Sequence, residues 1–322
     1  MKLPRLTKPA HDQMRFRGVY MIIILFVLAG CSSQSEAAAT PTQEATSAAT
    51  SAPLPTPASP TSTFTPGLAS VTPFICNEDW QSFPVLPVVT DAARILYQQG
   101  LAHGNNSQAF SKIGDGEIST EWVFTAFDLG EEHYDLGVYQ NLKTTIENFQ
   151  GSFERRSVAA RRGFNTTLIL DSSTADPAFC NSGESPLNCE LRIHNPSIAI
   201  LSLGTNQVHR PEEFEAGMRE IIDVLISRRV LPILSTKGDN LEGDHRINRT
   251  IACLAQEYEI PLWNFWAAIQ PLPNHGLQPD LEHLTYSGAN DFDDSHAMQY
   301  AWAVRNLTAL RVLDEVWRSV NQ

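Results

Sequence analysis

The residues at 197–203, Ser-Ile-Ala-Ile-Leu-Ser-Leu, constrain the fold more than any other stretch of this chain. Apolar side chains occupy both alternating faces of the run, which is typical of a strand buried on both sides within a parallel sheet. The run ends abruptly at Gly204-Thr205-Asn206. A sheet built around such a strand needs helices over both of its faces.

Helix and strand patterns alternate on either side of this run. We expect helices at 91–101, 139–148, 155–162, 211–227, 246–258 and 301–317, and strands at 109–114, 165–170, 197–203, 230–234 and 261–264. This order predicts a three-layer α/β/α sandwich with a mostly parallel, flavodoxin-like sheet. Ligands bind beyond the carboxyl ends of the strands in such sheets, so the site is expected there.

The first thirty residues have the features of an export signal. A basic segment precedes an apolar run at 20–30 that is too short to span a bilayer. Leu28-Ala29-Gly30-Cys31 resembles a bacterial lipobox, which implies a signal peptide at 1–30 and a lipid-anchored Cys31 facing outside the cytoplasm. The alternatives are an ordinary secretory signal or a short membrane anchor, and Met14 is an alternative start.

Residues 31–73 are rich in Ala, Ser, Thr and Pro and have few large apolar side chains. Such a segment cannot bury a core, and its prolines favour an extended tether. We therefore expect one folded domain at 74–322. The net charge of −13 disfavours nucleic acid as a partner, and we expect a monomer.

Four cysteines remain once Cys31 is assigned to lipid, an even number that suits an exported domain. Cys180 and Cys189 flank a short polar segment, and a disulfide between them would close a surface loop. Cys76 and Cys253 would form the second pair. The alternative is four free thiols, with Cys253 in the core of a helix.

Three short motifs stand at predicted strand ends or before the last helix. They are Gly114-Asp115-Gly116, Gly204-Thr205-Asn206 and Asp280-Leu281-Glu282-His283. In order and approximate separation they resemble blocks I, III and V of the SGNH (GDSL-type) hydrolase superfamily. The resemblance covers residue 110 to the C-terminus and implies an SGNH hydrolase-like fold and ester hydrolysis, with no cofactor and no metal.

The resemblance also assigns roles. Asp280 would orient His283, and His283 would take the proton of the nucleophile. The side chain of Asn206 would stabilise the oxyanion, together with a backbone N–H for which Gly163 is our candidate. The alternative roles are a turn cap for Asn206 and a hydrogen-bonded loop position for His283.

The first motif departs from the family at one position. The family pattern requires Gly-Asp-Ser, and this chain has Gly116 in place of the serine, so the attacking hydroxyl is missing. Ser119 is a candidate replacement, although three residues displace it by several ångströms. Glu117, acting on water with His283, is another.

Several other features have two interpretations. Asp293 and His296 repeat the Asp-x-x-His spacing, but they lie in an acidic stretch that lacks the EF-hand pattern for calcium, so we prefer Asp280 and His283. The aromatic residues after the last predicted strand fit a core better than a carbohydrate pocket: Trp263, Phe265 and Trp266. The arginines at 155, 156, 161 and 162 fit the solvated face of a helix better than an anion site.

Two functions follow. The first is an extracytoplasmic SGNH-type esterase, acetylesterase or acyl transferase that acts on small esters or polysaccharide with an atypical nucleophile. The second is a catalytically inactive relative that binds a glycan or another surface ligand. A two-lobed solute-binding protein is disfavoured, because the pattern shows one α/β domain.

Overall fold

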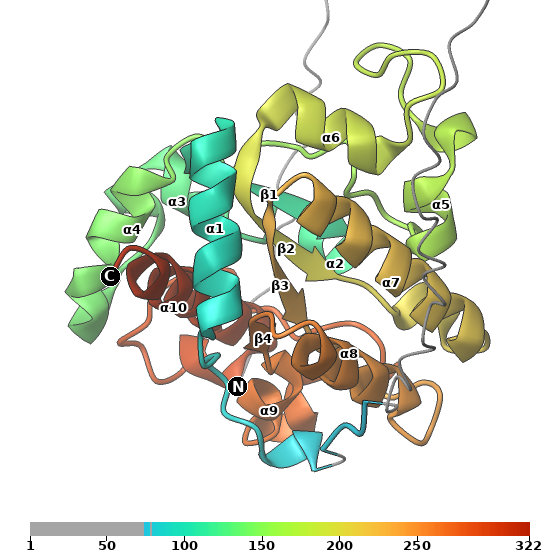
Figure 1. Ribbon diagram of the computed structural model, residues 1–322. Helices are drawn as coiled ribbons and strands as arrows, with labels where there is room; N and C mark the ends of the chain where they lie inside the picture. The colour runs from blue at the N-terminus through green and yellow to red at the C-terminus, as the bar shows by residue number, and fades with distance from the viewer. Residues whose placement is uncertain (1–73, 78) are drawn as a thin grey trace, which may run out of the picture. The chain divides into compact units, whose positions relative to one another are not determined.

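The computed structural model describes residues 74–77 and 79–322. Its sheet has four parallel strands in the order β1-β2-β3-β4, drawn in Figure 1: β1 (Asn106–Gly114), β2 (Pro196–Ser202), β3 (Leu231–Ser235) and β4 (Leu262–Trp263). The predicted α/β sandwich with a parallel sheet is confirmed. The predicted signal peptide, Cys31 and tether lie outside the described residues.

Strand β2 shows why the sheet has a helical layer on each face. Ile198 and Ile200 belong to one hydrophobic cluster, whereas Ala199 and Leu201 belong to another, because successive strand side chains point to opposite faces. Helices from both layers supply the two clusters (Figure 1): α1 (Asp91–His103) and α10 (Ala301–Val320) the first, α7 (Pro211–Ser227) and α8 (Arg246–Glu257) the second. The core therefore has two halves, one on each side of the sheet.

Shorter helices connect these elements. The α-helices are α2 (Gly116–Ser119), α3 (Ala126–Leu129), α4 (Lys143–Asn148), α5 (Thr166–Leu170), α6 (Pro186–His194) and α9 (Phe265–Ile269). The 3₁₀ turns are Trp80–Ser82, Glu131–His133, Gly137–Leu142, Ser172–Thr174, Thr205–Gln207, Pro273–Gly276 and Ala297–Gln299. The helix predicted at 139–148 is thus a 3₁₀ turn followed by α4.

The helix predicted at 155–162 is wrong. Backbone N–H groups that a helix would use are bound by side chains instead: Val158 donates to Glu190 Oε2 at 3.1 Å, and Ala159 donates to Ser157 Oγ at 3.1 Å. Ala160 then forms a parallel bridge to Gly114. The segment is therefore irregular, with a turn at 158–159, and it meets the carboxyl end of β1 at Ala160.

The strand predicted at 165–170 is also wrong, because this segment forms α5. The side chain of Asn165 caps the helix by accepting the N–H of Leu168 at 2.9 Å. A short apolar run fits a strand or a buried helix equally well, and here the cap and the packing of Thr166 against Gly217 of α7 select the helix.

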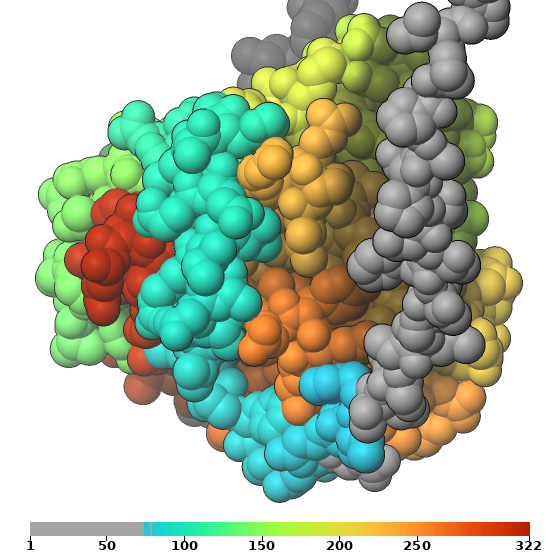
Figure 2. All heavy atoms as spheres, viewed as in Figure 1, coloured from blue at the N-terminus to red at the C-terminus, as the bar shows by residue number. Residues whose placement is uncertain are grey.

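Two disulfides join the four predicted cysteines in the expected pairs, Cys180–Cys189 and Cys76–Cys253. The second ties the start of the domain to α8. Figure 2 shows this N-terminal segment lying against the orange surface of α8 and α9. In the described part of the chain, no helix is both long and apolar enough to cross a bilayer.

Candidate active site

The turn after β1 carries the first motif. A Cβ at Gly114 would collide with the backbone of Ser202 on β2, so this position requires glycine. Asp115 follows and is buried, and its Oδ1 accepts the N–H of Glu117 at 3.1 Å and caps α2. Burial, reinforced by the negative charge of Glu117, raises the pKa of Asp115 to about 7.

Gly116, unlike Gly114, is not required by the fold. Its φ does not lie in the left-handed region, and a Cβ placed there would meet only Cγ of Arg162, at 3.8 Å. That distance is an ordinary van der Waals contact. The backbone at position 116 therefore accommodates a Cβ without strain, and it does not explain the missing hydroxyl.

The loops that carry Asn206 and Gly163 lie side by side. Nδ2 of Asn206 donates to the carbonyl oxygen of Phe164 at 2.9 Å, which leaves the second hydrogen of that amide available. Within residues 74–77 and 79–322, the N–H of Gly163 donates no hydrogen bond. Arg162, in the same loop as Gly163, contacts the Cβ position of Gly116. The loop at 162–164 therefore lies next to both the Gly114-Asp115-Gly116 motif and Asn206.

His283 and Asp280 form a direct hydrogen bond. Nδ1 of His283 lies 2.8 Å from Oδ2 of Asp280, and the backbone N–H of His283 donates to Oδ1 at 3.0 Å. This N–H and that of Glu282 are the main reasons why the pKa of Asp280 falls to about 2. Asp280 is thus ionised at neutral pH, and both side chains are about half exposed.

The second Asp-x-x-His has a different geometry. Oδ1 of Asp293 accepts the N–H of Val138 at 3.1 Å, and the ring of His296 packs against Tyr300 with 5.4 Å between centroids. In the described residues, no hydrogen bond joins the side chains of Asp293 and His296. The geometry that orients an imidazole is found at Asp280 and His283.

A buried arginine lies below the first motif. Arg305 of α10 has no exposed surface, donates from Nη2 to Ser202 Oγ at 2.9 Å, and lies over the rings of Phe265 and Trp263. Its Nη1 is 3.4 Å from Oε2 of Glu117. Burial raises the pKa of Glu117, against the opposing positive charge of Arg305.

Sequence reasoning missed Arg305. The available signal was one arginine on the apolar face of the terminal helix, where an unpaired charge is costly.

A second buried ion cluster joins the loops after β2 and β3. Nζ of Lys237 lies 2.5 Å from Asp239 Oδ1 and 2.7 Å from Glu242 Oε2, and Thr205 Oγ1 donates to Asp239 Oδ2 at 2.6 Å. This cluster fixes the loop that carries Asn206. In the part of the chain that the structure describes, no group of three or more His, Cys, Asp or Glu side chains is placed to hold a metal ion.

The aromatic residues at the end of β4 and just after it are mainly structural. Trp263 and Phe265 are fully buried, which confirms the core interpretation for both. Trp266 is partly buried and packs against Trp80 and His245, with ring centroids 5.0 and 5.5 Å away.

Ser119 borders two hollows of the described chain. It lines a hollow of about 730 Å³ and also a smaller one of about 300 Å³. His283, Asp280 and Asn206 line neither of them. Ser119 is one helical turn from Gly116 on α2, facing a group of arginines.

No family model matches the sequence, and no curated protein matches it. Solved structures with a similar fold include a GDSL-like lipase from Bacteroides thetaiotaomicron (12% identity, 70% of this chain and 98% of that one, TM-score 0.37). A second is a putative lipolytic protein of the G-D-S-L family from Desulfitobacterium hafniense (13% identity, 64% of this chain and 99% of that one, TM-score 0.38). A third is an acetylxylan esterase from Geobacillus stearothermophilus (15% identity, 65% of this chain and 94% of that one, TM-score 0.39). The chain is similar to GDSL-type lipases and esterases, the group that its motifs also resemble, at identities and TM-scores from which nothing about its activity follows.

Proposed function

We propose that the chain is a lipid-anchored, extracytoplasmic hydrolase of small esters in which water takes the place of the missing serine hydroxyl. The observation that carries the proposal is the hydrogen bond between His283 and Asp280, which leaves the other ring nitrogen of His283 without a partner in the described residues. A histidine held in this way is oriented to accept a proton from a water through that nitrogen.

The proposed reaction needs no group beyond those of the site. The oxygen of a water in the space beside Gly116 bonds to the acyl carbon while His283 accepts its proton. The oxyanion is stabilised by the amide of Asn206 and the N–H of Gly163. The C–O bond to the alcohol then breaks, and His283 returns the proton to the leaving oxygen, which gives an acid and an alcohol.

The location outside the cytoplasm is supported by the two disulfides, which persist in oxidising compartments, and by the lipobox-like sequence before Cys31. The second candidate function, a catalytically inactive lipoprotein that binds a glycan or another surface ligand, is favoured by Gly116 itself. The backbone there accommodates a Cβ, yet the chain lacks the serine.

Hydrolysis of p-nitrophenyl acetate by the full chain separates these functions. Activity that His283→Ala abolishes and Ser119→Ala leaves intact supports water as the nucleophile, whereas loss in Ser119→Ala identifies a displaced serine. His296→Ala is the matched control, because it removes a histidine of the same spacing that lacks the aspartate hydrogen bond.

The remaining outcomes concern Gly116→Ser. An inert parent that becomes active in this variant shows a site that retains everything except the nucleophile, which supports the binding function. If the parent and Gly116→Ser are both inert, the assignment of the site is wrong.

A further inference from the structure

A hollow beside β1 and α2 is strongly basic. Its volume is about 730 Å³, and five cationic side chains line it: Lys112, Arg155, Arg156, Arg161 and Arg162. Asp176 is the one acidic residue in its wall. Such a concentration of positive charge is unexpected in a chain with a net charge of −13, and it results from the irregular, non-helical path of residues 155–162.

Three of these arginines have no carboxylate partner among residues 74–77 and 79–322, namely Arg156, Arg161 and Arg162. Arg155, by contrast, pairs with the fully buried Glu190. The close positive charges repel one another: the charge of Arg155 adds to burial in lowering the pKa of Lys112 to about 8. An anion in the hollow would offset this repulsion.

Three of the five basic side chains are held in place. Arg161 lies over the ring of Phe164, 4.1 Å from its centroid, and Nζ of the buried Lys112 donates to the carbonyl oxygen of Phe153 at 2.6 Å. Glu190 anchors Arg155 and also accepts the hydroxyl of Ser111 at 2.6 Å. A preformed arrangement of donors reduces the entropy cost of binding a ligand.

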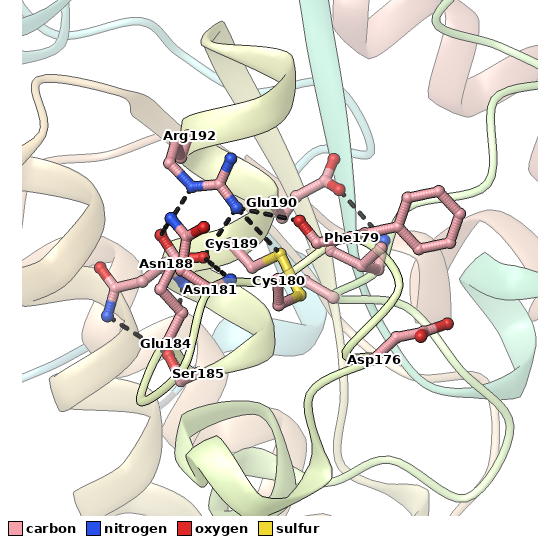
Figure 3. Close-up of a disulfide and its surroundings, with 12 residues drawn as sticks. Asp176, Phe179, Cys180, Asn181, Glu184, Ser185, Asn188, Cys189, Glu190 and Arg192 are labelled. Atoms are coloured by element: carbon pink, nitrogen blue, oxygen red, sulfur yellow. Dashed lines mark hydrogen bonds and ion pairs between the residues drawn. A yellow bond between two sulfur atoms is a disulfide. The ribbon is translucent and has the colours of Figure 1, made fainter. Parts of the chain in front are cut away.

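The opposite wall is fixed by the Cys180–Cys189 disulfide, shown in Figure 3. Arg192 lies over the bridge, where it pairs with Glu184 at 2.6 Å and donates to the carbonyl oxygen of Phe179 at 3.0 Å. The Phe179 ring extends away from the bridge and is 60% exposed. An exposed aromatic ring beside several arginines fits a ligand with both an apolar and an anionic part.

The hollow also reaches the candidate active site. Arg162 is one of its lining residues, and Cγ of Arg162 is the nearest atom to the Cβ position of Gly116, at 3.8 Å. A molecule whose ester lies at Gly116 would extend naturally past Arg162 and Ser119. Planar guanidinium groups bind carboxylates and phosphates through paired hydrogen bonds.

We propose that this hollow binds an anionic group, a carboxylate or a phosphate, of the molecule whose ester lies at Gly116. Its role as a substrate subsite rests on the proposed function, whereas its binding of anions does not. The anion-site interpretation of the four arginines, which the sequence did not favour, is the one that their arrangement supports.

The test is calorimetric titration of the full chain with inorganic phosphate and, separately, with citrate, at low and at high ionic strength. We expect saturable binding that salt weakens, and a loss of affinity of about tenfold or more in Arg161→Gln/Arg162→Gln. Arg156→Gln, which removes an exposed side chain, should weaken binding without affecting folding. Tighter binding of phosphate or of citrate indicates which anion the hollow prefers.

The matched control is Arg228→Gln/Arg249→Gln, which removes two exposed arginines outside the hollow. Absence of saturable binding to both probes, or equal losses in the control, overturns the proposal. If the chain binds anions but hydrolyses no ester, the proposed function is wrong and the anion site stands. If the chain hydrolyses esters but binds neither phosphate nor citrate, the anion site is wrong and the proposed function stands.

Discussion

The guanidinium of Arg305, which has no exposed surface, lies 3.4 Å from the carboxylate of Glu117, the residue next to Gly116. The last helix of the domain thereby supports the turn that carries the first motif. The aromatic rings around Arg305 exclude water from one side of the pair, which makes each partner dependent on the other.

Arg305→Met should lower the free energy of unfolding by about 3–5 kcal/mol, because it leaves the mostly buried Glu117 carboxylate without its partner. Adding Glu117→Gln should recover part of that loss. Urea denaturation measures both effects, with Arg311→Met on the same helix as the control. A double variant no more stable than Arg305→Met alone would show that the pair is not coupled.

Asp115 should make the domain less stable as the pH rises. Its pKa in the folded state is about 7, above the ordinary value of about 3.9, so the folded state binds more protons than the unfolded state between pH 4 and 7. Stability should fall through this window, by up to about 4 kcal/mol at 1.36 kcal/mol per pH unit.

Asp115→Asn keeps the Oδ1 acceptor that caps α2 and removes the charge, so it should flatten this pH dependence. Denaturation at pH 4.5 and at pH 8 measures the change. Asp244→Asn is the control, because the pKa of exposed Asp244 is lowered to about 2 and it does not titrate in this window. Equal slopes in the wild type and Asp115→Asn would contradict the prediction.

The two glycines of the first motif should respond in opposite ways to alanine. Gly116→Ala should be neutral or stabilising by up to about 1 kcal/mol, since its φ suits alanine and the Cβ has room. Gly114→Ala should be destabilising by more than that, because the Cβ collides with the backbone of Ser202. Thermal unfolding ranks the two variants, and the reverse order would refute the described geometry.

The disulfides should differ in how much they stabilise the domain. Cys76–Cys253 joins residues 177 positions apart and Cys180–Cys189 joins residues 9 apart. Loop-closure entropy gives about 5 and about 3 kcal/mol, respectively. Urea denaturation under non-reducing conditions of two variants, each with both cysteines of one disulfide replaced by serine, tests which disulfide stabilises the domain more. Replacing both cysteines avoids leaving a free thiol in either variant.

The sequence by itself determined the parallel sheet and the position of the motifs. The apolar run at 197–203 can satisfy both of its faces only inside a layered α/β domain, and the glycine turns mark the strand ends where ligands bind. The pairing of the cysteines also followed, in part from the short separation of Cys180 and Cys189. These features depend on neighbours in the chain, which a sequence displays directly.

Only the tertiary structure decided the surroundings of Gly116. Residues 155–162 do not form a helix because Glu190, some thirty positions away, takes the N–H of Val158, and their irregular path gathers the arginines into one hollow. Arg305 contacts Glu117 although the two residues lie far apart in the sequence. Contacts between residues so far apart arise when helices pack on the sheet, so local patterns do not encode them.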